Sequence, residues 1–251
     1  MRLLELVRQH PRYGYRRMTA LLRAEGWALN GKRVYRLWRR EGLKVPRKQR
    51  KKRRLGSSAH GCVRRRAEHA DHVWAWDFVF DRTQDGRTLK WLSIVDEYTR
   101  ECLALEVGRR FPAQQVIDVL VELLAVRGVP EFIRSDNGPE FIAQAIRRQL
   151  HATGVATLYI EPGAPWENGY AESFHARLRD EFLDREEFTS MAEAKTLGAS
   201  WRADYNHRRP HSALGYRTPA AFAAGCRSAC SATLRSPSDT PLVVPLSPIL
   251  S

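Results

Sequence analysis

Three acidic residues stand where a carboxylate could perform chemistry. Asp77 interrupts the aromatic, β-branched run WAWDFVF at 74–80, where an ionised side chain is costly unless a partner neutralises it. Asp136 follows the strand-like run FIRS at 132–135, and Glu172 lies in the first turn of a predicted helix that follows WENG. Gathered carboxylates repel one another, so a cluster of the three is stable only with cations bound.

Carboxylate oxygens are hard ligands that select Mg²⁺ or Mn²⁺. Two such ions, about 3.5–4 Å apart, activate an attacking oxygen and stabilise the leaving oxygen in phosphoryl transfer. We therefore expect Asp77, Asp136 and Glu172 to be the catalytic residues and to bind two metal ions. The gap of 35 residues between Asp136 and Glu172 is weak evidence alone. The prediction rests on the sequences that surround each of the three acids.

The elements that must position these acids follow from the apolar periodicity. Strands are expected at 72–80, 89–96, 102–107, 131–135 and 155–160. Helices are expected at 112–127, 140–153, 169–183 and 191–206. Strands first, then alternating helices and strands, are typical of an α/β layer with a mixed sheet. The acids converge if the strands pair and the helix at 169–183 packs across them.

The charge of the chain is concentrated in its first quarter. Residues 1–66 hold 22 Lys and Arg against 3 Asp and Glu, a balance of +19, whereas the remainder has a balance of −5. A basic segment of this density favours a polyanion as partner, because counterion release drives the affinity. Nucleic acid is favoured over a membrane surface, since the run lacks a companion apolar face.

The first 43 residues predict a small helical DNA-binding unit. Helices are indicated near 3–7, 16–25 and 31–41, and Asn30 is suited to cap the third. Two helices joined by a short turn, the second with a basic face, are typical of a helix-turn-helix; a small helical bundle without this role is the alternative. The residues expected to contact DNA are Arg33, Arg36 and Arg40 in the third helix and Lys51, Lys52, Arg53 and Arg54 in the basic run that follows.

These patterns divide the chain into four segments. We expect a helix-turn-helix domain at 1–43, a basic linker at 44–70, an α/β catalytic core at 71–224 and a disordered Ser/Pro-rich tail at 225–251. No apolar run reaches the roughly 20 residues that span a bilayer, and an intracellular protein is expected. A zinc site from His207, His211 and two later cysteines is disfavoured against a polar segment that closes a helix.

Several polar residues near the three acids allow two interpretations. Asn137 and Asn168 could orient metal-bound water or the substrate, but Asn-Gly is also a turn signal. Asp96 is expected to lie near Asp77 across the sheet, more as a turn residue than as a metal ligand. His175, in the same helix as the third acid, could contact DNA or be a surface residue.

The motifs resemble the orfB-type transposases of the insertion sequence three family, which share the retroviral integrase core. The resemblance covers residues 10–224 and includes YGYRRM (13–18), KRVYRLWRREGL (32–43), WAWDFVF (74–80), SIVDEYTRE (93–101), IRSDNGPEF (133–141), PGAPWENGYAESFHARLRDE (162–181) and YNHRRPHSALGYRTPAAF (205–222). One departure is Trp76, which stands where the family more often has Thr and is expected to change packing rather than chemistry.

The resemblance implies an RNase H-like core in which Asp77, Asp136 and Glu172 bind the metal ions. It implies that Arg179 contacts the DNA at the element's ends. The implied activity is DDE transposition in the bacterial cytoplasm, near the nucleoid: water cleaves the element's 3′ end, and the freed 3′-OH attacks another phosphodiester. The implied partners are double-stranded DNA carrying the terminal repeats and the target, further copies of this chain, and the product of an upstream overlapping frame.

Two other functions share part of this evidence. A structure-specific RNase H-like nuclease would use the same acids without joining DNA, and it would not need an end-specific helix-turn-helix. A catalytically decayed or regulatory DNA-binding protein would occupy terminal repeats without cutting. Inverted repeats around the gene and an overlapping upstream frame would favour transposition over both.

The basic face of the third helix gives a first prediction. Arg36→Ala should weaken duplex binding and lower the slope of log K against log salt concentration by about one, because one phosphate contact is lost. Binding titrations at several salt concentrations measure this slope. An unchanged slope would remove the helix-turn-helix assignment of that face.

Overall fold

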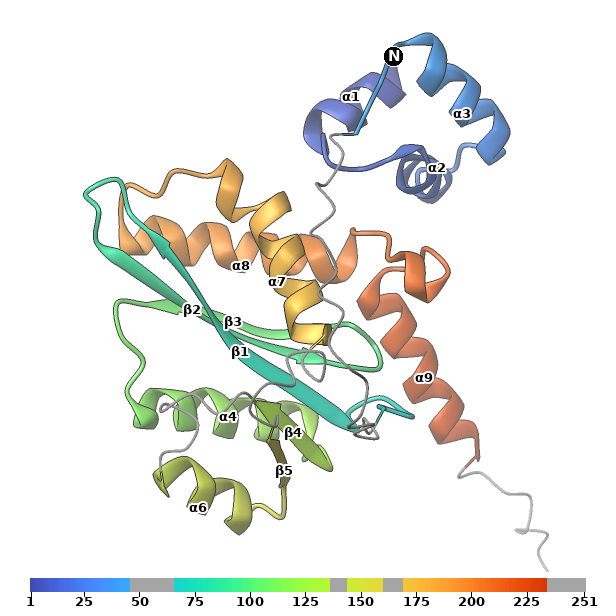
Figure 1. The fold of residues 1–251 in the computed structure, drawn as a ribbon. Helices are drawn as coiled ribbons and strands as arrows, with labels where there is room; N and C mark the ends of the chain where they lie inside the picture. The colour runs from blue at the N-terminus through green and yellow to red at the C-terminus, as the bar shows by residue number, and fades with distance from the viewer. Residues whose placement is uncertain (46–65, 136–143, 160–168, 234–251) are drawn as a thin grey trace, which may run out of the picture.

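The computed structural model describes residues 1–45, 66–135, 144–159 and 169–233 (Figure 1). The N-terminal arm contains α1 (Arg2–Gln9), α2 (Tyr15–Ala24) and α3 (Gly31–Arg40). The core continues with β1 (Val73–Arg82), β2 (Thr88–Asp96), β3 (Cys102–Gly108), α4 (Ala113–Arg127), β4 (Phe132–Ser135), α6 (Gln144–Ala152), β5 (Ala156–Tyr159), α7 (Gly169–Glu181), α8 (Met191–His207) and α9 (Pro219–Thr233). Every strand and helix expected for the core occurs in the expected order.

The described strands form one five-stranded sheet in the order β3-β2-β1-β4-β5. The first three strands are antiparallel neighbours, as their short polar connections predict. β4 is parallel to β1, and β5 is parallel to β4. The mixed α/β sheet expected from the sequence is therefore confirmed, with β1 at its centre.

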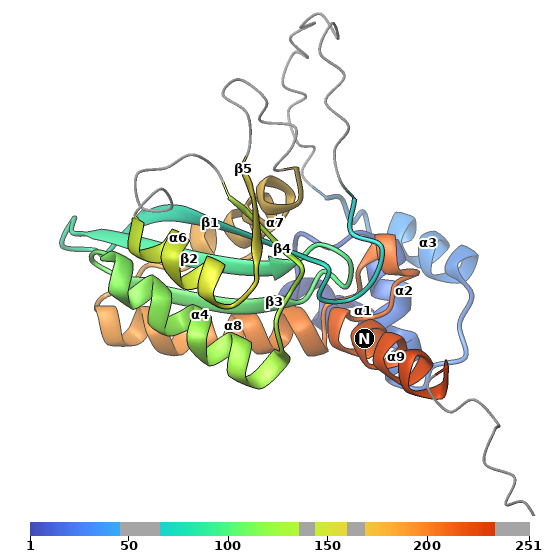
Figure 2. The same ribbon diagram turned by 90° about the horizontal axis from the view of Figure 1, so that it is seen from below.

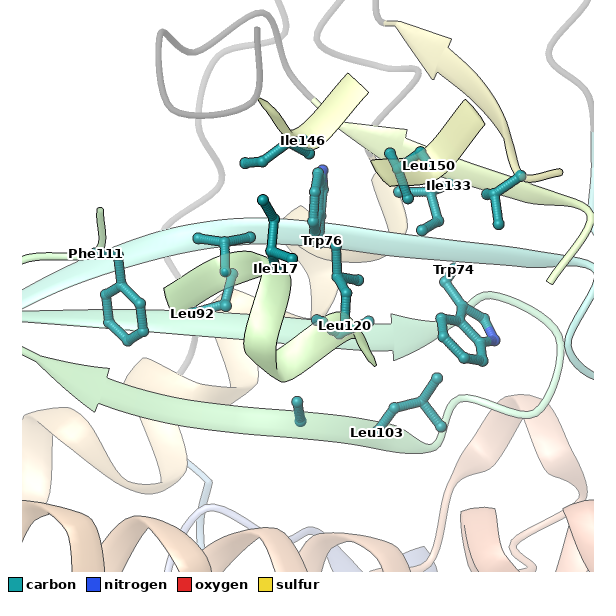
Figure 3. Packing of buried hydrophobic residues seen from close by; sticks show 14 residues of the cluster. Trp74, Trp76, Leu92, Leu103, Phe111, Ile117, Leu120, Ile133, Ile146 and Leu150 are labelled. Atoms are coloured by element: carbon teal, nitrogen blue, oxygen red, sulfur yellow. The ribbon is translucent and has the colours of Figure 1, made fainter. Parts of the chain in front are cut away.

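Helices cover both faces of this sheet, with α4 and α6 on one side and α7 and α8 on the other (Figures 1 and 2). Successive side chains of a strand point to opposite faces, so Trp74 and Trp76 pack toward α4 and α6. Both indole rings are buried, and Trp76 lies near Ile117 and Ile146 (Figure 3). Trp76 thus serves packing, and the intervening residues of β1 face α7 and α8.

The second layer is held close to the sheet by a glycine in α8. Gly198 is buried against the ring of Trp91 from β2, and a Cβ atom at that position would lie 2.6 Å from Trp91 Cζ3. No side chain larger than hydrogen fits there without movement of the indole. α8 therefore lies directly on the aromatic cluster that also contains Phe174 and Leu178 of α7.

The arm has its own apolar core and a charged outer face. Val34 and Trp38 of α3 are buried against α1 and α2, and the Asn30 side chain accepts a hydrogen bond from the Arg33 N–H at 2.8 Å, which confirms the predicted cap. The side chains of Arg33, Arg36 and Arg40 are exposed.

A buried ion-pair cluster attaches the arm to the end of α7. Arg209 Nε and Nη2 donate to the two carboxylate oxygens of Glu181 at 2.6 and 2.7 Å, and Arg17 Nη1 of α2 donates to Oε1 at 3.2 Å. The Arg17 guanidinium lies over the Tyr13 ring, 4.9 Å from its centroid. Because Glu181 ends the helix that contains Glu172, the arm and the candidate site share one rigid element.

The C-terminal boundary differs from the expected one. α9 runs through residue 225, where a disordered tail was predicted to begin, and it continues to Thr233. Its sequence, PAAFAAGCRSACSAT, is rich in Ala and contains no internal proline, so it supports a helix despite its serines. Among the residues described, no helix is long and apolar enough to cross a lipid bilayer.

Loss of the Glu181 charge should destabilise the protein. Glu181→Gln leaves Arg209 buried without its counterion, at an expected cost of about 3 kcal/mol in the free energy of unfolding. The half-buried pair Arg12–Asp180, at 3.4 Å, supplies the control, and Asp180→Asn should change stability by less than about 1 kcal/mol. Urea unfolding of both variants measures the difference, and equal small effects would contradict a buried attachment.

The same pair should depend on pH. Burial alone would raise the pKa of Glu181, but the hydrogen bond and charge of Arg209 and the charge of Arg17 outweigh it and hold that pKa below its ordinary value of 4.5. A carboxyl with a depressed pKa contributes stability above the unfolded-state pKa and loses it as the pH falls through the folded-state pKa. The stability difference between wild type and Glu181→Gln should therefore shrink as the pH falls below about 4.5.

Candidate active site

Asp77 lies in β1 on the face of the sheet that α7 covers. Pairing of β1 with β4 is recorded at 73–75, so Asp77 lies two residues beyond that ladder, while β2 still pairs with it on the other side. Its side chain is 19% exposed, and its Oδ1 accepts the Phe78 N–H at 2.7 Å. A carboxylate in the middle of a central strand is thus reachable from one face of the sheet.

Glu172 lies in the first turn of α7, and its side chain is exposed. His175, one turn later on the same side of the helix, has its Nδ1 atom 3.5 Å from Oδ2 of Asp77. The face of α7 that bears Glu172 is therefore turned toward Asp77. The structure thus places the first turn of α7, which carries Glu172, on the side of the sheet that carries Asp77.

His175 was the least well predicted residue of this region. It is not a simple surface residue, since its side chain is 13% exposed and turned toward the sheet, and its contact with DNA stays a prediction. Its Nε2 atom lies 2.8 Å from the hydroxyl of Ser93, which pairs with Asp77 across β1 and β2. Burial, followed by the positive charge of Arg179, lowers the pKa of His175 to about 4, so the imidazole is neutral at neutral pH.

Arg179 extends the same face of α7 by one further turn. Its guanidinium is exposed, and Nη2 donates to the Phe80 carbonyl oxygen at 3.1 Å. This places a cation at the edge of the face that contains Asp77. The remaining predicted site residues lie outside the described residues: Asp136, Asn137, Asn168, Lys51, Lys52, Arg53 and Arg54.

A buried ion pair braces the end of β4. Arg134 Nε donates to Glu97 Oε1 at 2.8 Å, with side-chain exposures of 5% and 0%. Glu97 directly follows β2 and Arg134 lies in β4, so the ion pair holds the ends of these two strands together. Asp136 follows the end of β4 in the sequence. This pair could not be predicted from the sequence, because partners on separate strands leave no local pattern.

The start of α7 is braced in a similar way. The Arg100 guanidinium lies 3.7 Å from the centroid of the Tyr170 ring, in a cation–π contact. Arg100 has a φ of 65°, in the left-handed region that non-glycine residues rarely adopt, and it lies in the tight turn after Asp96. Contacts at both ends of α7, with Arg100 at one and Arg209 at the other, thus fix the helix that carries Glu172.

Asp96 is a turn residue, as expected. Its Oδ1 accepts the Tyr98 N–H at 2.9 Å, while Oδ2 accepts the Thr99 hydroxyl at 2.7 Å and the Asp71 N–H at 3.2 Å. The side chain is fully buried, and burial raises its pKa despite these donors. Its oxygens face the β2–β3 turn, so they are occupied by backbone and hydroxyl donors.

One further group of ligating side chains lies at the opposite, amino-terminal ends of β1 and β4. The ligating atoms of His69, His72 and Glu131 all lie within 4.8 Å of one another. The Glu68 N–H donates to Nδ1 of His72 at 3.0 Å, so a neutral His72 carries its proton on Nε2, 3.5 Å from Glu131. Nε2 of His72, the nitrogen that a metal would need, therefore carries a proton. The three side chains instead link the segments that lead into β1 and β4.

Comparison with known proteins defines the class of this protein. Residues 67–165 and 153–219 match families described as integrase core domain, and residues 1–52 match the family described as HTH-like domain. A mixed five-stranded sheet with acids on β1 and α7, preceded by a helical arm, agrees with this match. The protein is thus an integrase-core protein of the polynucleotidyl transferase class.

Relatives then fix the family. The chain is 39% identical over 236 residues to the insertion element IS407 uncharacterized 31.7 kDa protein of Burkholderia multivorans, covering 92% of this chain and 82% of that protein. It is 40% identical to the insertion element IS476 uncharacterized 39.2 kDa protein of Xanthomonas euvesicatoria, over 90% of this chain but only 65% of the relative. It is 28% identical to transposase InsF for insertion sequence IS3A of Escherichia coli, over 88% of this chain and 80% of that protein. The chain belongs to the insertion sequence three family of transposases.

Solved structures confirm the fold. A simian T-cell lymphotropic virus intasome, in complex with PP2A regulatory subunit B56 gamma, matches 74% of this chain and 62% of its own with a TM-score of 0.55 and 18% identity. The HTLV-2 integrase catalytic core domain in complex with magnesium, in a dimeric form, matches 63% of this chain and 99% of its own with a TM-score of 0.50 and 14% identity. The expected RNase H-like, integrase-type core is therefore confirmed.

Asp96 and Asp77 should differ in function: a change at Asp96 should affect stability and not metal binding. Asp96→Asn turns an amide toward one of three donors and should lower the free energy of unfolding by about 1–3 kcal/mol. It should leave Mn²⁺ affinity unchanged. The exposed Asp118 of α4 provides the control, and Asp118→Asn should change stability by less than about 0.5 kcal/mol. Loss of Mn²⁺ binding in a folded Asp96→Asn protein would contradict the turn assignment.

Proposed function

We propose that this protein is a DDE transposase that cleaves the ends of an insertion sequence and transfers the 3′-OH to another DNA phosphodiester. The supporting observation is the approach of α7 to Asp77: the helix face with Glu172 is turned to a carboxylate on the central strand, with His175 Nδ1 at 3.5 Å. Acids on separate elements that converge on a sheet face suit the binding of shared cations. Family membership and the helical arm support DNA as the substrate.

Asp136 is proposed as the third acid. It lies outside the described residues, so the support comes from the strand before it. β4 is parallel to β1, with Arg134 opposite Ala75, and two positions later in the sequence these residues are followed by Asp136 and Asp77. The turn DNG that Asp136 opens suits a chain that leaves the sheet at this level.

The proposed cofactor is Mg²⁺ or Mn²⁺, with two ions per site. The donor set fits hard divalent cations, because Asp77 and Glu172 offer carboxylate oxygens and the third proposed ligand is also a carboxylate. When bound, such ions supply electrostatic stabilisation of the charge that develops in phosphoryl transfer. The protein's own contribution is to hold the carboxylates on rigid elements, with Asn137 and Asn168 proposed to orient the ligands or the substrate.

The proposed substrate path runs from the arm to α7. Arg33, Arg36 and Arg40 on α3 are exposed and are proposed to bind the element's terminal repeat, with the basic run at 51–54 on adjacent phosphates. Arg179, beside the site, is proposed to contact the DNA end. We propose the division into a helix-turn-helix domain at 1–43, a basic linker at 44–70, a catalytic core at 71–224 and a tail at 225–251, with α9 continuing past the core boundary to Thr233.

The assembly is proposed to contain several copies of this chain on the element's ends and target DNA in the bacterial cytoplasm. Joining requires both ends of the element to be held together. One copy of the chain, with a single catalytic site, would not hold both. The product of an upstream overlapping frame is proposed as a further partner or fusion segment. The chain spans 65% of the length of its Xanthomonas relative, which leaves room for such a segment in the family.

Removal of any one acid should abolish activity. Asp77→Asn, Asp136→Asn and Glu172→Gln should each lower Mg²⁺-dependent cleavage and joining of end-containing duplexes by at least about 10²-fold, since each variant removes a charge on the shared cations. Asp180→Asn, on the same helix as Glu172 but paired with Arg12 at 3.4 Å, is the matched control and should remain active. Full activity in one of the three variants would remove that residue from the mechanism. Cleavage without joining in the wild type would indicate a nuclease, and binding without cleavage a regulatory DNA-binding protein.

A further inference from the structure

His175 joins Asp77 to a buried hydroxyl. Its Nδ1 atom lies 3.5 Å from Asp77 Oδ2, and its Nε2 atom lies 2.8 Å from Ser93 Oγ. Ser93 is 1% exposed and stands directly opposite Asp77 in the β1–β2 ladder. The imidazole therefore fills the space between α7 and the two central strands, with one nitrogen on each partner.

The protons available to this group are few. A neutral imidazole has one N–H, and the Ser93 hydroxyl has one hydrogen, which reaches either His175 Nε2 or the Asp77 carbonyl oxygen at 3.2 Å. In one arrangement Ser93 donates to Nε2, and Nδ1–H points at Asp77. In the other, Nε2–H points at Ser93, Ser93 donates to the Asp77 carbonyl, and a bare Nδ1 faces the carboxylate.

The first arrangement is electrostatically favourable, and the second is not. An ionised carboxylate only accepts hydrogen bonds, so a nitrogen lone pair 3.5 Å away repels it. An N–H at that place attracts it. The 2.8 Å contact to Ser93 is also the shorter of the two open to that hydroxyl.

We propose that His175 is a positioning residue for Asp77, with Ser93 donating to its Nε2 atom and its Nδ1–H donating to the Asp77 carboxylate. This role rests on the proposed function, in which Asp77 binds the metal ions. Oδ1 of Asp77 already accepts the Phe78 N–H at 2.7 Å, so a donor on Oδ2 fixes the rotation of the carboxylate from both sides. A carboxylate oxygen has two lone pairs, so one such donor does not by itself exclude a cation from that oxygen.

The arrangement also sets the register of α7. His175 lies one turn after Glu172, so the residue that orients the first acid is carried by the helix that presents the third. Hydrogen bonds of this kind to a ligating carboxylate change metal affinity by roughly 10- to 100-fold when they are lost. The effect should therefore appear in metal binding itself, before any reaction with DNA.

The test is Mn²⁺ binding to the full chain, followed by the electron paramagnetic resonance signal of free Mn²⁺. His175→Ala should weaken binding by at least about 10-fold, and Ser93→Ala should weaken it by less. His175→Asn, which places an amide N–H near the Nδ1 position, should restore most of the affinity, whereas His175→Gln, which places it near Nε2, should not. Wild-type affinity in His175→Ala, or equal affinities of the Asn and Gln variants, would overturn the proposal.

The protonated nitrogen can be observed directly. The ¹⁵N and ¹H NMR signals of His175 in the metal-free protein at neutral pH should be those of a neutral Nδ1–H imidazole. A neutral Nε2–H imidazole would overturn the arrangement, independently of any effect of the variants on folding.

Failure of this role and failure of the proposed function give different results. If Asp77→Asn and Glu172→Gln bind Mn²⁺ as the wild type does, the metal site itself is wrong, and the role of His175 falls with it. If those two variants lose binding while His175→Ala keeps it, the metal site stands, and only the positioning role is overturned.

Discussion

Repulsion between carboxylates on one face of a sheet is the constraint on which this structure depends. Asp77 lies on the central strand, and Glu172 is presented by a helix that packs on that same face. Negative charges that meet on one face of a sheet are unfavourable in the absence of counter-charge. In the proposed function, shared cations supply that counter-charge. In the described part of the chain, hydrogen-bond donors and buried ion pairs hold the residues around the site in place.

Most of these hydrogen bonds and ion pairs involve α7. Its start is held by Arg100 stacked on Tyr170, its middle by His175 against Asp77, and its end by the pair of Glu181 with Arg209. The last contact also includes Arg17 from the arm, so a helical unit with an exposed basic face is attached to the far end of the helix that presents the third acid. The arm and the candidate site are thereby linked through one continuous helix, which would hold DNA bound by the arm, as proposed, at a defined distance from the site. This arrangement gives a physical reason for a small DNA-binding unit and a catalytic core to share one chain.

Much of the fold could be predicted, because local patterns determine it. The alternation around Asp77, the helical stripe of Val34 and Trp38, and the cap at Asn30 are each set by residues close in sequence. The position of Asp77 and the helix of Glu172 followed from the same patterns. Their convergence was expected only on condition that the strands pair and that the helix at 169–183 packs across them, and the resemblance to a family implied the same.

What could not be predicted depends on long-range contacts. The pair of Arg134 with Glu97 joins two strands, and the contact of His175 with Ser93 joins a helix to a strand, so neither leaves a periodic signal. No helix was predicted at 219–233, because the serines after residue 227 suggested a tail, whereas the helix-forming alanines support α9 there.

Whether the three acids share metal ions can be measured by anomalous X-ray diffraction from crystals grown with Mn²⁺. Anomalous peaks are expected within about 2.6 Å of carboxylate oxygens of Asp77, Asp136 and Glu172. Peaks absent from this place, or acids too far apart to bind a common ion, would contradict a shared metal site.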